Sequence, residues 1–471
     1  MMFATPGRAQ AVRQKNWTLP FFLIAIAAAC WFAQPARADL WNTGYYAGYQ
    51  QDTMVASNLD FSALSHIIHF SIIPNTDGSL NTSGNGLSAS HSSDLITRAH
   101  AAGKKVLVCV GGAGSGAGFE GATTNANRAK FITNLINFMS SRGYDGIDVD
   151  WEPLLQADAN QYTNFIIGLR TNLNGFVQPK FLTAAAGAYS DYRDPVNAEY
   201  QLFASLQTNF DQINIMTYDL SGPYAGWVTW FNSPLYDDGY HFPSTGGLLP
   251  SVDGAVNNFI SSGVAPYRLG IGVAFYGYVW TGGSGTVPAG GVTIPRQSWT
   301  TNAPTVTTPS YANIINSYYA SNQYHWDTNA QAAYLGKTNS PAFISYDDER
   351  TCQVKVSYAR NRGLGGVMIW ELSLDFFPAQ TGAQRAPLLD ALKQSLATPG
   401  LTEIQLQGKG LQLSFNSLPL SLYRVMWTSN IVDGSWNTLS NNVNGTGGIL
   451  RISDPNPPID PQRFYRVKTP P

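Results

Sequence analysis

Charged side chains are scarce in this sequence, and that scarcity narrows the kind of partner the chain can bind. Only 12% of the 471 residues are Asp, Glu, Lys or Arg, and the 28 basic residues are balanced by 30 acidic ones. A chain without a basic excess has no cationic patch for nucleic acid, so no nucleic-acid partner is expected. Aromatic residues, at 13%, are abundant instead. This composition suits an uncharged polymer, because sugars bind to aromatic faces and to neutral hydrogen-bonding groups.

No apolar run near the N-terminus is long enough for an ordinary membrane span. Residues 19–33 are apolar, but fifteen residues fall short of the roughly 20 that a membrane helix needs. Basic residues precede the run and a small-residue cleavage site follows it at 36–38, so residues 1–38 are predicted to be a secretory signal peptide. A lipoprotein anchored at Cys30 is the alternative, although the expected leucine is missing. We expect a secreted chain that begins at Asp39 and has no membrane contact.

Removal of the predicted signal peptide would take away four basic residues and no acidic ones. The remaining chain would carry 24 basic and 30 acidic residues, a net charge of −6. Of the three cysteines, only Cys109 and Cys352 would be left. A secreted protein can form a disulfide, but these two lie in a predicted strand and a predicted helix far apart in the sequence. Two unpaired, buried thiols are the simpler interpretation.

Strand patterns and helix patterns alternate along residues 39–398. The predicted strands are 42–49, 66–72, 105–111, 146–152, 181–188, 212–219, 269–276 and 366–372. The predicted helices between them include 94–102, 127–142, 158–174, 252–262 and 351–362. Eight strands with helical crossovers favour an α/β fold, the closed (β/α)8 TIM barrel, over an open sheet. In such a barrel the chemistry takes place at the carboxyl ends of the strands.

Two regions depart from this alternation. Residues 279–345 are too many for a structureless crossover, and we predict a small α+β insertion between the seventh and eighth strands. After a helix at 386–396 and a linker at 397–400, residues 401–471 change to short alternating strands. They predict a small all-β sandwich that serves as an accessory domain. Its Trp427 and Trp436 would form either a sugar platform or, more commonly, part of the core.

Residues 145–152 read Asp-Gly-Ile-Asp-Val-Asp-Trp-Glu, in which apolar and acidic side chains alternate. This is the period of a β-strand, so Asp148, Asp150 and Glu152 point to one face at roughly 7 Å intervals. Three carboxylates on a half-buried strand are costly unless some are protonated or hydrogen-bonded. The same crowding raises a carboxyl pKa for general-acid chemistry. A solvated acidic face is the alternative, but the spacing favours catalysis.

The stretch resembles the D-x-x-D-x-D-x-E signature of the family 18 glycoside hydrolases, the chitinases and their relatives. All four acidic positions match. The resemblance implies that Glu152 is the general acid, that Asp150 is its partner and that Asp148 lies behind them. Asp145 falls outside the alternation, and a structural role at the start of the strand is expected for it.

Two further segments resemble the family. Met216-Thr217-Tyr218-Asp219 matches M-x-Y-D at the end of the sixth strand. By that resemblance, Tyr218 hydrogen-bonds the substrate's acetamido group, and Met216 and Asp219 line the same subsite. Trp370, in the eighth strand, matches the tryptophan that forms the floor of the cleavage subsite. A packed barrel tryptophan is the alternative for this residue.

Weaker matches extend the expected substrate site. Gly44-Tyr45-Tyr46 matches on the first strand and Gly111-Gly112 after the third, and the glycines would let the backbone approach the acidic strand closely. We therefore place Tyr45 and Gly112 in the substrate site. The aromatic residues just past Asp219 are candidates for the leaving-group side: Tyr224, Trp227 and Trp230.

Three positions depart from the family pattern. Cys109 replaces the serine of S-x-G-G and removes a good hydroxyl donor near the acids. Pro153 follows Glu152 where an aromatic residue is usual, and Tyr278 stands where the family often has arginine after Tyr-Gly. None of these changes removes the acid, so activity is expected.

The resemblance implies a secreted, monomeric chitinase that binds chitin or N-acetylglucosamine oligosaccharides and needs no cofactor and no metal. The implied mechanism is retaining and assisted by the substrate's own acetamido group. An endo-β-N-acetylglucosaminidase that cuts N-glycan cores can share the acidic signature. A chitin-binding lectin on the same barrel is the non-enzymatic alternative. Lectin-like relatives typically lose the glutamate, whereas Glu152, Asp150 and Tyr218 are all present here.

Overall fold

The computed structural model describes residues 40–189, 199–283 and 290–397 of the chain. In the C-terminal segment it describes residues 401–407, 410–417, 422–429, 435–445, 449–455 and 463–468. The predicted signal peptide and most of the predicted linker lie outside the described residues. Within the described ranges, no helix is long and apolar enough to cross a membrane.

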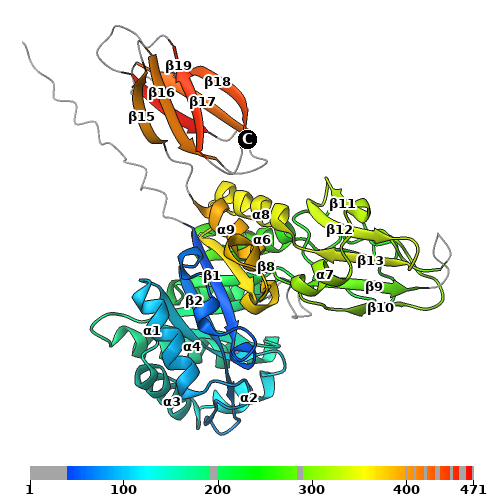
Figure 1. Cartoon of the computed structure of the whole chain (residues 1–471). Coiled ribbons are helices and arrows are strands. Elements are labelled where there is room, and N and C mark those ends of the chain that lie inside the picture. Colours follow the sequence, from blue (N-terminus) through cyan, green and yellow to red (C-terminus); the bar gives the residue numbers. More distant parts are fainter. Residues whose placement is uncertain are drawn as a thin grey trace, which may run out of the picture. The chain divides into compact units, whose positions relative to one another are not determined.

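Eight parallel strands form a closed barrel (Figure 1). They are β1 (Trp41–Ala47), β2 (His66–Pro74), β4 (Lys105–Gly112), β5 (Gly146–Trp151), β6 (Phe181–Gly187), β7 (Gln212–Met216), β8 (Leu269–Ala274) and β14 (Gly366–Trp370). β1 pairs in parallel with both β14 and β2, which closes the sheet. A short strand, β3 (Leu80–Asn81), pairs antiparallel with the end of β2. The predicted TIM barrel is confirmed.

Helices lie between these strands, and one further helix, α9, follows the last of them. They are α1 (Ala89–Ala101), α2 (Gly116–Ala122), α3 (Arg128–Arg142), α4 (Ala159–Asn174), α5 (Glu199–Leu206), α6 (Val252–Ser261), α8 (Glu349–Arg362) and α9 (Pro387–Leu396). α1 begins earlier than predicted because the Ser88 hydroxyl accepts a hydrogen bond from the His91 N–H and caps the helix. The short helices α2 and α5 were not predicted. α2 contains three glycines in seven residues, which hides any helical pattern.

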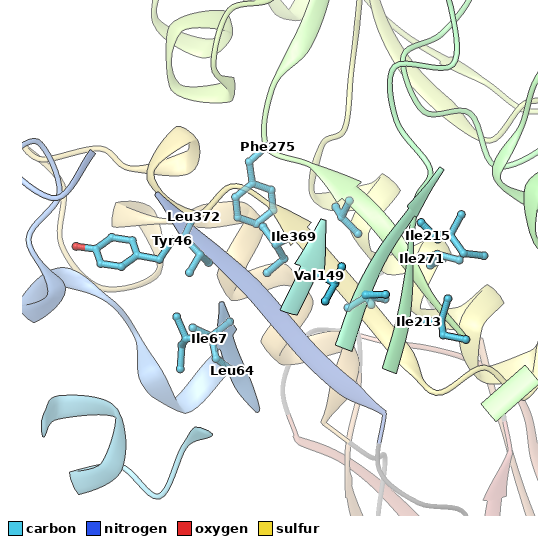
Figure 2. Packing of buried hydrophobic residues seen from close by; sticks show 14 of the residues in the cluster. Tyr46, Leu64, Ile67, Val149, Ile213, Ile215, Ile271, Phe275, Ile369 and Leu372 are labelled. Atoms are coloured by element: carbon cyan, nitrogen blue, oxygen red, sulfur yellow. The ribbon is translucent and has the colours of Figure 1, made fainter. Parts of the chain in front are cut away.

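The main hydrophobic core joins strand side chains to helix side chains. Figure 2 shows part of this cluster, including Val149 of β5, Ile215 of β7, Ile271 of β8 and Ile369 of β14. Helix residues such as Phe165 and Leu392 belong to the same cluster. The apolar face of the acidic strand therefore packs toward the helices, which leaves its carboxyl groups on the opposite face.

A five-stranded antiparallel sheet is inserted between β8 and β14, the seventh and eighth strands of the barrel. Its elements are β9 (Gly277–Gly282), β10 (Pro304–Thr307), α7 (Tyr311–Ser317), β11 (Tyr324–Asp327), β12 (Ala332–Lys337) and β13 (Ala342–Tyr346). A second hydrophobic cluster contains Trp280 and Phe343 of this sheet together with Trp230 and Phe231. The predicted α+β insertion is confirmed at this place.

The C-terminal segment forms two antiparallel sheets of three strands each, β15-β16-β19 and β18-β17-β20. The strands are β15 (Leu401–Gln407), β16 (Gly410–Asn416), β17 (Leu422–Thr428), β18 (Asn437–Asn444), β19 (Ile449–Asp454) and β20 (Phe464–Lys468). Leu413 and Phe415 of one sheet pack with Tyr423 and Val425 of the other. This is a small sandwich with its own core, as the strand pattern predicted.

The two tryptophans of the sandwich lie against arginines. The Arg463 guanidinium is 3.6 Å from the centre of the Trp427 ring, and the Arg466 guanidinium is 3.9 Å from that of Trp436. One face of each indole is therefore covered by a cation. A sugar would have to use the other face.

Candidate active site

Asp148 lies at the centre of a buried layer formed by four barrel strands. It is 0% exposed, and it accepts hydrogen bonds from the Tyr45 hydroxyl at 2.8 Å and the Thr183 hydroxyl at 2.6 Å. The Cys109 thiol also hydrogen-bonds it. The strand register sets Cys109 of β4 and Thr183 of β6 opposite Asp148. Burial raises the pKa of Asp148, and the three donors oppose that rise.

Asp150 and Glu152 are hydrogen-bonded neighbours at the carboxyl end of β5. Asp150 is 2% exposed. Burial, followed by the charges of Glu152 and Asp148, raises the pKa of Asp150 well above its usual range, and its hydrogen bond to Glu152 acts in the same direction. Asp150 is therefore the proton donor in this pair. Its Oδ1 atom is buried and accepts no hydrogen bond from the described residues.

Gly111 lets the β4 backbone pass directly beside this pair. Its φ is +116°, a conformation that L side chains rarely adopt. A Cβ atom at this position would lie 1.8 Å from the Asp150 carbonyl oxygen. At Gly112 a Cβ atom would lie 2.6 Å from the Phe70 ring. Gly111 therefore allows a close approach to the acidic strand, and Gly112, whose φ is +113°, makes room for the Phe70 ring of β2.

Two cavities meet at Glu152. The larger, of about 640 Å³, is lined by residues that include Asp150, Glu152, Met216, Tyr218, Asp219, Tyr224, Trp227 and Trp370. The smaller, of about 380 Å³, also includes Glu152 and Trp370 in its lining and extends toward Tyr49, Phe70 and Gly112. Glu152 and Trp370 therefore lie at the junction of the two cavities. A chain of sugars could occupy both sides of this junction.

Trp370 is partly exposed and is held by aromatic contacts. Its ring centroid lies 5.4 Å from that of Tyr45 and 4.9 Å from that of Phe70, with the Phe70 contact edge to face. Because it lines both cavities, it is not simply a packed barrel tryptophan. Tyr45 is itself buried and lies in the lining of neither cavity. It positions Asp148 and Trp370 rather than offering a free surface.

Tyr218 follows β7 directly and has its ring over Gly272 of β8. A Cβ atom at position 272 would lie 2.8 Å from that ring, so this glycine makes room for it. Burial raises the pKa of Tyr218 well above its usual range, and the charges of Asp150 and Glu152 add to the effect. Tyr218 is therefore a neutral hydroxyl donor beside the acids.

Asp219 has a different set of partners from the β5 acids. Its Oδ1 atom accepts hydrogen bonds from the Tyr276 hydroxyl at 2.6 Å and the Tyr278 hydroxyl at 2.8 Å. Its backbone N–H donates to the Asn232 side-chain oxygen at 2.9 Å, and its φ is 56°, in the left-handed region. Tyr278, the departure from the family pattern, is thus a direct contact of an expected site residue.

The three aromatic residues after Asp219 divide into two groups. Tyr224 is 59% exposed, and its ring packs edge to face on Trp227 at 5.1 Å. Both line the larger cavity. Trp230 is 0% exposed and donates its indole N–H to the Pro250 carbonyl. The interpretation of Trp230 as a leaving-group contact was wrong, because that residue packs into the second hydrophobic cluster, beside the insertion.

Asp145 lies at the other end of β5. It accepts hydrogen bonds from the Val106 N–H, from His100 and from Lys105. Burial opposes its ionisation, but these donors together lower the pKa of Asp145. These contacts hold the start of the strand, which fits the expected structural role.

Several residues of the site were not identified from the sequence. Thr183 could have been noticed from the sequence, because it is the polar member of an otherwise apolar strand segment. Tyr276 and Gly272 could not have been identified from the sequence, because the residues that they contact in the site lie far away in the chain. Within the described ranges, no group of three or more His, Cys, Asp or Glu is placed to hold a metal ion.

Comparison with known proteins agrees with this geometry. The family model described as "Glycosyl hydrolases family 18" matches residues 42–375, so the chain belongs to this family. Chitinase A1 of Niallia circulans is 29% identical over 371 residues, which are 73% of this chain and 49% of that protein. This chain therefore spans about half the length of that relative.

Solved structures share the fold. The Ostrinia furnacalis Group IV chitinase superposes with a TM-score of 0.63 at 22% identity, covering 76% of this chain and 100% of that one. A family 18 N-acetylglucosaminidase from Paenibacillus barengoltzii superposes with a TM-score of 0.60 at 26% identity, again covering 76% and 100%. The matched portion is 76% of this chain in both cases.

Proposed function

We propose that this chain is a secreted chitinase that hydrolyses β-1,4 bonds between N-acetylglucosamine units, with Glu152 as general acid and base. The observation that carries the proposal is the hydrogen bond between buried Asp150 and half-buried Glu152, which lies at the junction of two cavities whose lining includes Tyr218 and Trp370. Family membership and the relatives named as chitinases support the same assignment.

The mechanism follows from the side on which the two carboxyl groups lie. Most retaining glycosidases need two carboxyl groups about 5–5.5 Å apart, one of which attacks the sugar from the face opposite the acid. Asp150 and Glu152 project from the same face of one strand, so they approach the scissile bond from the same side. This pair therefore supplies no nucleophile on the opposite face of the sugar. The substrate's own 2-acetamido oxygen takes that role.

In the first step the acetamido oxygen attacks the anomeric carbon, and the bond to the leaving oxygen breaks as Glu152 gives that oxygen the proton of its hydrogen bond with Asp150, which leaves Asp150 as a carboxylate. Asp150 orients the acetamido group and stabilises the oxazolinium ion, and Tyr218 hydrogen-bonds the acetamido oxygen. In the second step Glu152 takes a proton from the incoming water, which opens the oxazolinium ring. The two inversions at the anomeric carbon give net retention.

A linear polymer fits the site better than a single terminal sugar. The cavities extend to both sides of Glu152, and aromatic side chains are present on each: Trp227 on one side and Phe70 on the other. Sugars bound on both sides hold the scissile bond at the junction. This arrangement favours chitin over the N-glycan core, the second enzymatic candidate from the sequence.

The first test replaces Glu152 with glutamine, which keeps the size of the side chain and removes its acidic carboxyl proton. Hydrolysis of chitin oligomers is expected to fall by at least about 10²–10⁴-fold, the usual contribution of a general acid, while binding measured by calorimetry persists. Glu120→Gln, at an exposed position of α2, is the matched control and is expected to behave as wild type. Wild-type rates in Glu152→Gln would contradict the assignment.

The second test concerns the substrate. Chitin oligomers and an N-glycosylated protein are digested side by side, and early products are read by NMR and mass spectrometry. We expect β-anomers first from the oligomers and N-acetylated sugars at every new reducing end of partially deacetylated chitin. An initial α-anomer, or frequent glucosamine at those ends, would rule out the mechanism. Release of N-glycans alone would favour the endo-β-N-acetylglucosaminidase, and binding without any hydrolysis would favour the lectin.

A further inference from the structure

Residues 217–220, which follow β7 and include Tyr218, lie outside any helix or strand. Thr217, Tyr218 and Leu220 are nevertheless buried. The backbone N–H and C=O groups of a buried segment that has no strand partner need hydrogen bonds from elsewhere. The residues that supply these bonds decide how Tyr218 is held beside the acids.

Two consecutive buried residues, Asn232 and Ser233, supply these bonds. The Asn232 side-chain oxygen accepts a hydrogen bond from the Asp219 N–H at 2.9 Å. The Asn232 carbonyl oxygen accepts one from the Leu220 N–H at 3.0 Å. The Ser233 hydroxyl donates to the Thr217 carbonyl oxygen. These two residues therefore hold the segment at three points.

Asn232 and Ser233 are in turn anchored to two other elements. The Asn232 N–H donates to the Ser345 hydroxyl, in β13 of the insertion, at 2.8 Å. The Lys355 ammonium, on α8, donates to the Ser233 hydroxyl and forms an ion pair with Asp347. Asn232, Ser233 and Ser345 are not among the described residues that line the two cavities. Any effect they have on a bound sugar must therefore pass through other residues.

Two features indicate that this arrangement restrains the geometry of the segment and does more than pack it. The φ of Asp219 is 56°, a conformation that costs a non-glycine residue energy and persists only where its surroundings impose it. Asn232 is 1% exposed, and its Nδ2 atom has no hydrogen-bond partner among the described residues. A buried amide without a partner lowers stability. Stability alone therefore does not account for an asparagine at this position.

We propose that Asn232 and Ser233 are positioning residues, which fix Tyr218 where its hydroxyl meets the acetamido oxygen during hydrolysis. The inference rests on the proposed function and adds to it residues that do not contact the substrate. Through Ser345, the inserted sheet then supports the reaction from outside the cavities. The hydrogen bond from Tyr218 must be aligned as the oxazolinium ion forms, so loss of the restraint should slow the reaction more than it weakens binding.

The test begins with Asn232→Ala, which removes the acceptor of the Asp219 N–H. We expect kcat on a soluble chitin oligomer to fall by about tenfold, the effect of one lost hydrogen bond in a reacting geometry, with KM within about twofold of wild type. Ser233→Ala removes the donor to Thr217, keeps the ion pair of Lys355, and should lower kcat in the same way. It takes the place of Asn232→Ala in every measurement should that variant fail to fold.

Tyr218→Phe distinguishes positioning from a general loss of structure. If Asn232 acts through the Tyr218 hydroxyl, adding Asn232→Ala to Tyr218→Phe should lower kcat by a further factor of less than about two, whereas independent effects would multiply. The control is Asn42→Ala. Asn42 is also buried, and its side-chain N–H donates to the Ala63 carbonyl oxygen at the start of β1, the opposite end of the barrel. This variant should lower the melting temperature and leave kcat within about twofold of wild type.

The outcomes separate this inference from the proposed function. Wild-type kcat in folded Asn232→Ala and Ser233→Ala, a further fall of about tenfold in the Tyr218→Phe background, or an equal fall in Asn42→Ala would overturn the inference. These results require a wild type that hydrolyses the oligomer and a slower Tyr218→Phe variant. No hydrolysis by the wild type, or wild-type kcat in Tyr218→Phe, would instead overturn the proposed function, and this inference would fall with it.

Discussion

At the scale of single residues, the site depends on how many donors each carboxyl group receives. Asp148 receives three, from Tyr45, Thr183 and Cys109. Asp150 is nearly as buried, but one of its oxygens accepts no bond from the described residues. A buried carboxylate with donors keeps its charge more readily than one without them. Burial therefore raises the pKa of both acids, and the donors oppose that rise at Asp148, whereas at Asp150 the neighbouring charges add to it.

Two substitutions around Asp148 should move the pH–rate profile in opposite directions. Asp148 lies behind Asp150 on the same strand face, and we expect the acid limb to follow the ionisation of Asp148 to a carboxylate. Cys109→Ser supplies a stronger donor, worth on the order of 0.5 kcal/mol, and should move the acid limb down by about 0.4 pH unit. Thr183→Val removes a donor and should move it up by a similar amount or more.

The profiles are measured as kcat/KM on a soluble chitin oligomer between pH 3 and 8. Cys352→Ser, which changes the other buried thiol, on α8, is the control and should leave the acid limb in place. Identical acid limbs in Cys109→Ser and Thr183→Val would contradict the contribution of these donors.

Asp150→Asn should stabilise the protein at neutral pH and not in acid. The pKa of Asp150 in the folded protein is raised above its ordinary value of 3.8, so the folded state binds the proton more tightly than the unfolded state. The contribution of protonated Asp150 to the free energy of unfolding is then fully present below pH 3.8. It is lost as the pH rises through the pKa of Asp150 in the folded protein. An amide has no charge to lose, so we expect a gain of at least about 1 kcal/mol at pH 7.

Thermal unfolding at pH 7 and pH 3 measures this effect. Asp52→Asn, at an exposed position, is the control and should have little effect at either pH. An equal change in melting temperature at both pH values for Asp150→Asn would show that the effect does not come from its ionisation.

At the scale of elements, one buried ion pair holds the ends of two barrel strands. Lys355 of α8 is fully buried and donates to Asp347 at 2.6 Å and to the Ser233 hydroxyl. Asp347 also accepts from the Ala274 N–H at the end of β8, and Ser233 donates to the Thr217 carbonyl after β7. The pair therefore ties α8 to the strand ends that carry Tyr218 and face the insertion.

Lys355→Met should destabilise the protein strongly. Burial already raises the pKa of Asp347, with the Lys355 ammonium opposing that rise, so removing the cation leaves a carboxyl group that is buried without compensation. Breaking such a pair typically costs about 3–5 kcal/mol. The double variant Lys355→Met/Asp347→Asn should lose less than the single variant, because no charge is left unpaired. Urea unfolding of both variants tests this, and a larger loss in the double variant would contradict it.

At the scale of the whole molecule, the described residues contain two structures that have separate hydrophobic cores. The barrel and its insertion share two clusters, and the C-terminal sandwich has its own, around Phe415 and Tyr423. A structure with its own core can usually fold alone. The residues of both cavities come from the barrel and the segments between its strands.

A chain that ends at Ala397 should therefore keep its activity on soluble oligomers. We expect kcat/KM within about twofold of the full chain, together with a cooperative thermal transition, because none of the described residues of the sandwich lines the two cavities. The measurement is hydrolysis of a short chitin oligomer by both proteins, with insoluble chitin in parallel. Loss of activity on the short oligomer would show that the barrel depends on residues 401–471.

The sequence by itself determined the local patterns. The alternation in residues 145–152 put Ile147, Val149 and Trp151 toward the helices, and the acids on the other face, because side chains in a strand alternate whatever the strand pairs with. The same reasoning found the eight barrel strands, the place of the insertion and the strands of the sandwich. Backbone geometry fixes which side chains of one strand or helix share a face. That pattern can therefore be predicted from the sequence without knowing what the element packs against.

Tertiary structure alone decided which distant residues meet. Tyr45 reaches Asp148 across 103 positions, and Tyr276 and Tyr278 reach Asp219 across 57 and 59. Trp230, by contrast, is predicted from the sequence to contact the leaving group, but in the structure it packs into the second hydrophobic cluster, beside the insertion. These contacts depend on closure of the barrel and on the docking of an inserted sheet. No periodicity within one segment encodes them, so these contacts are a property of the folded chain.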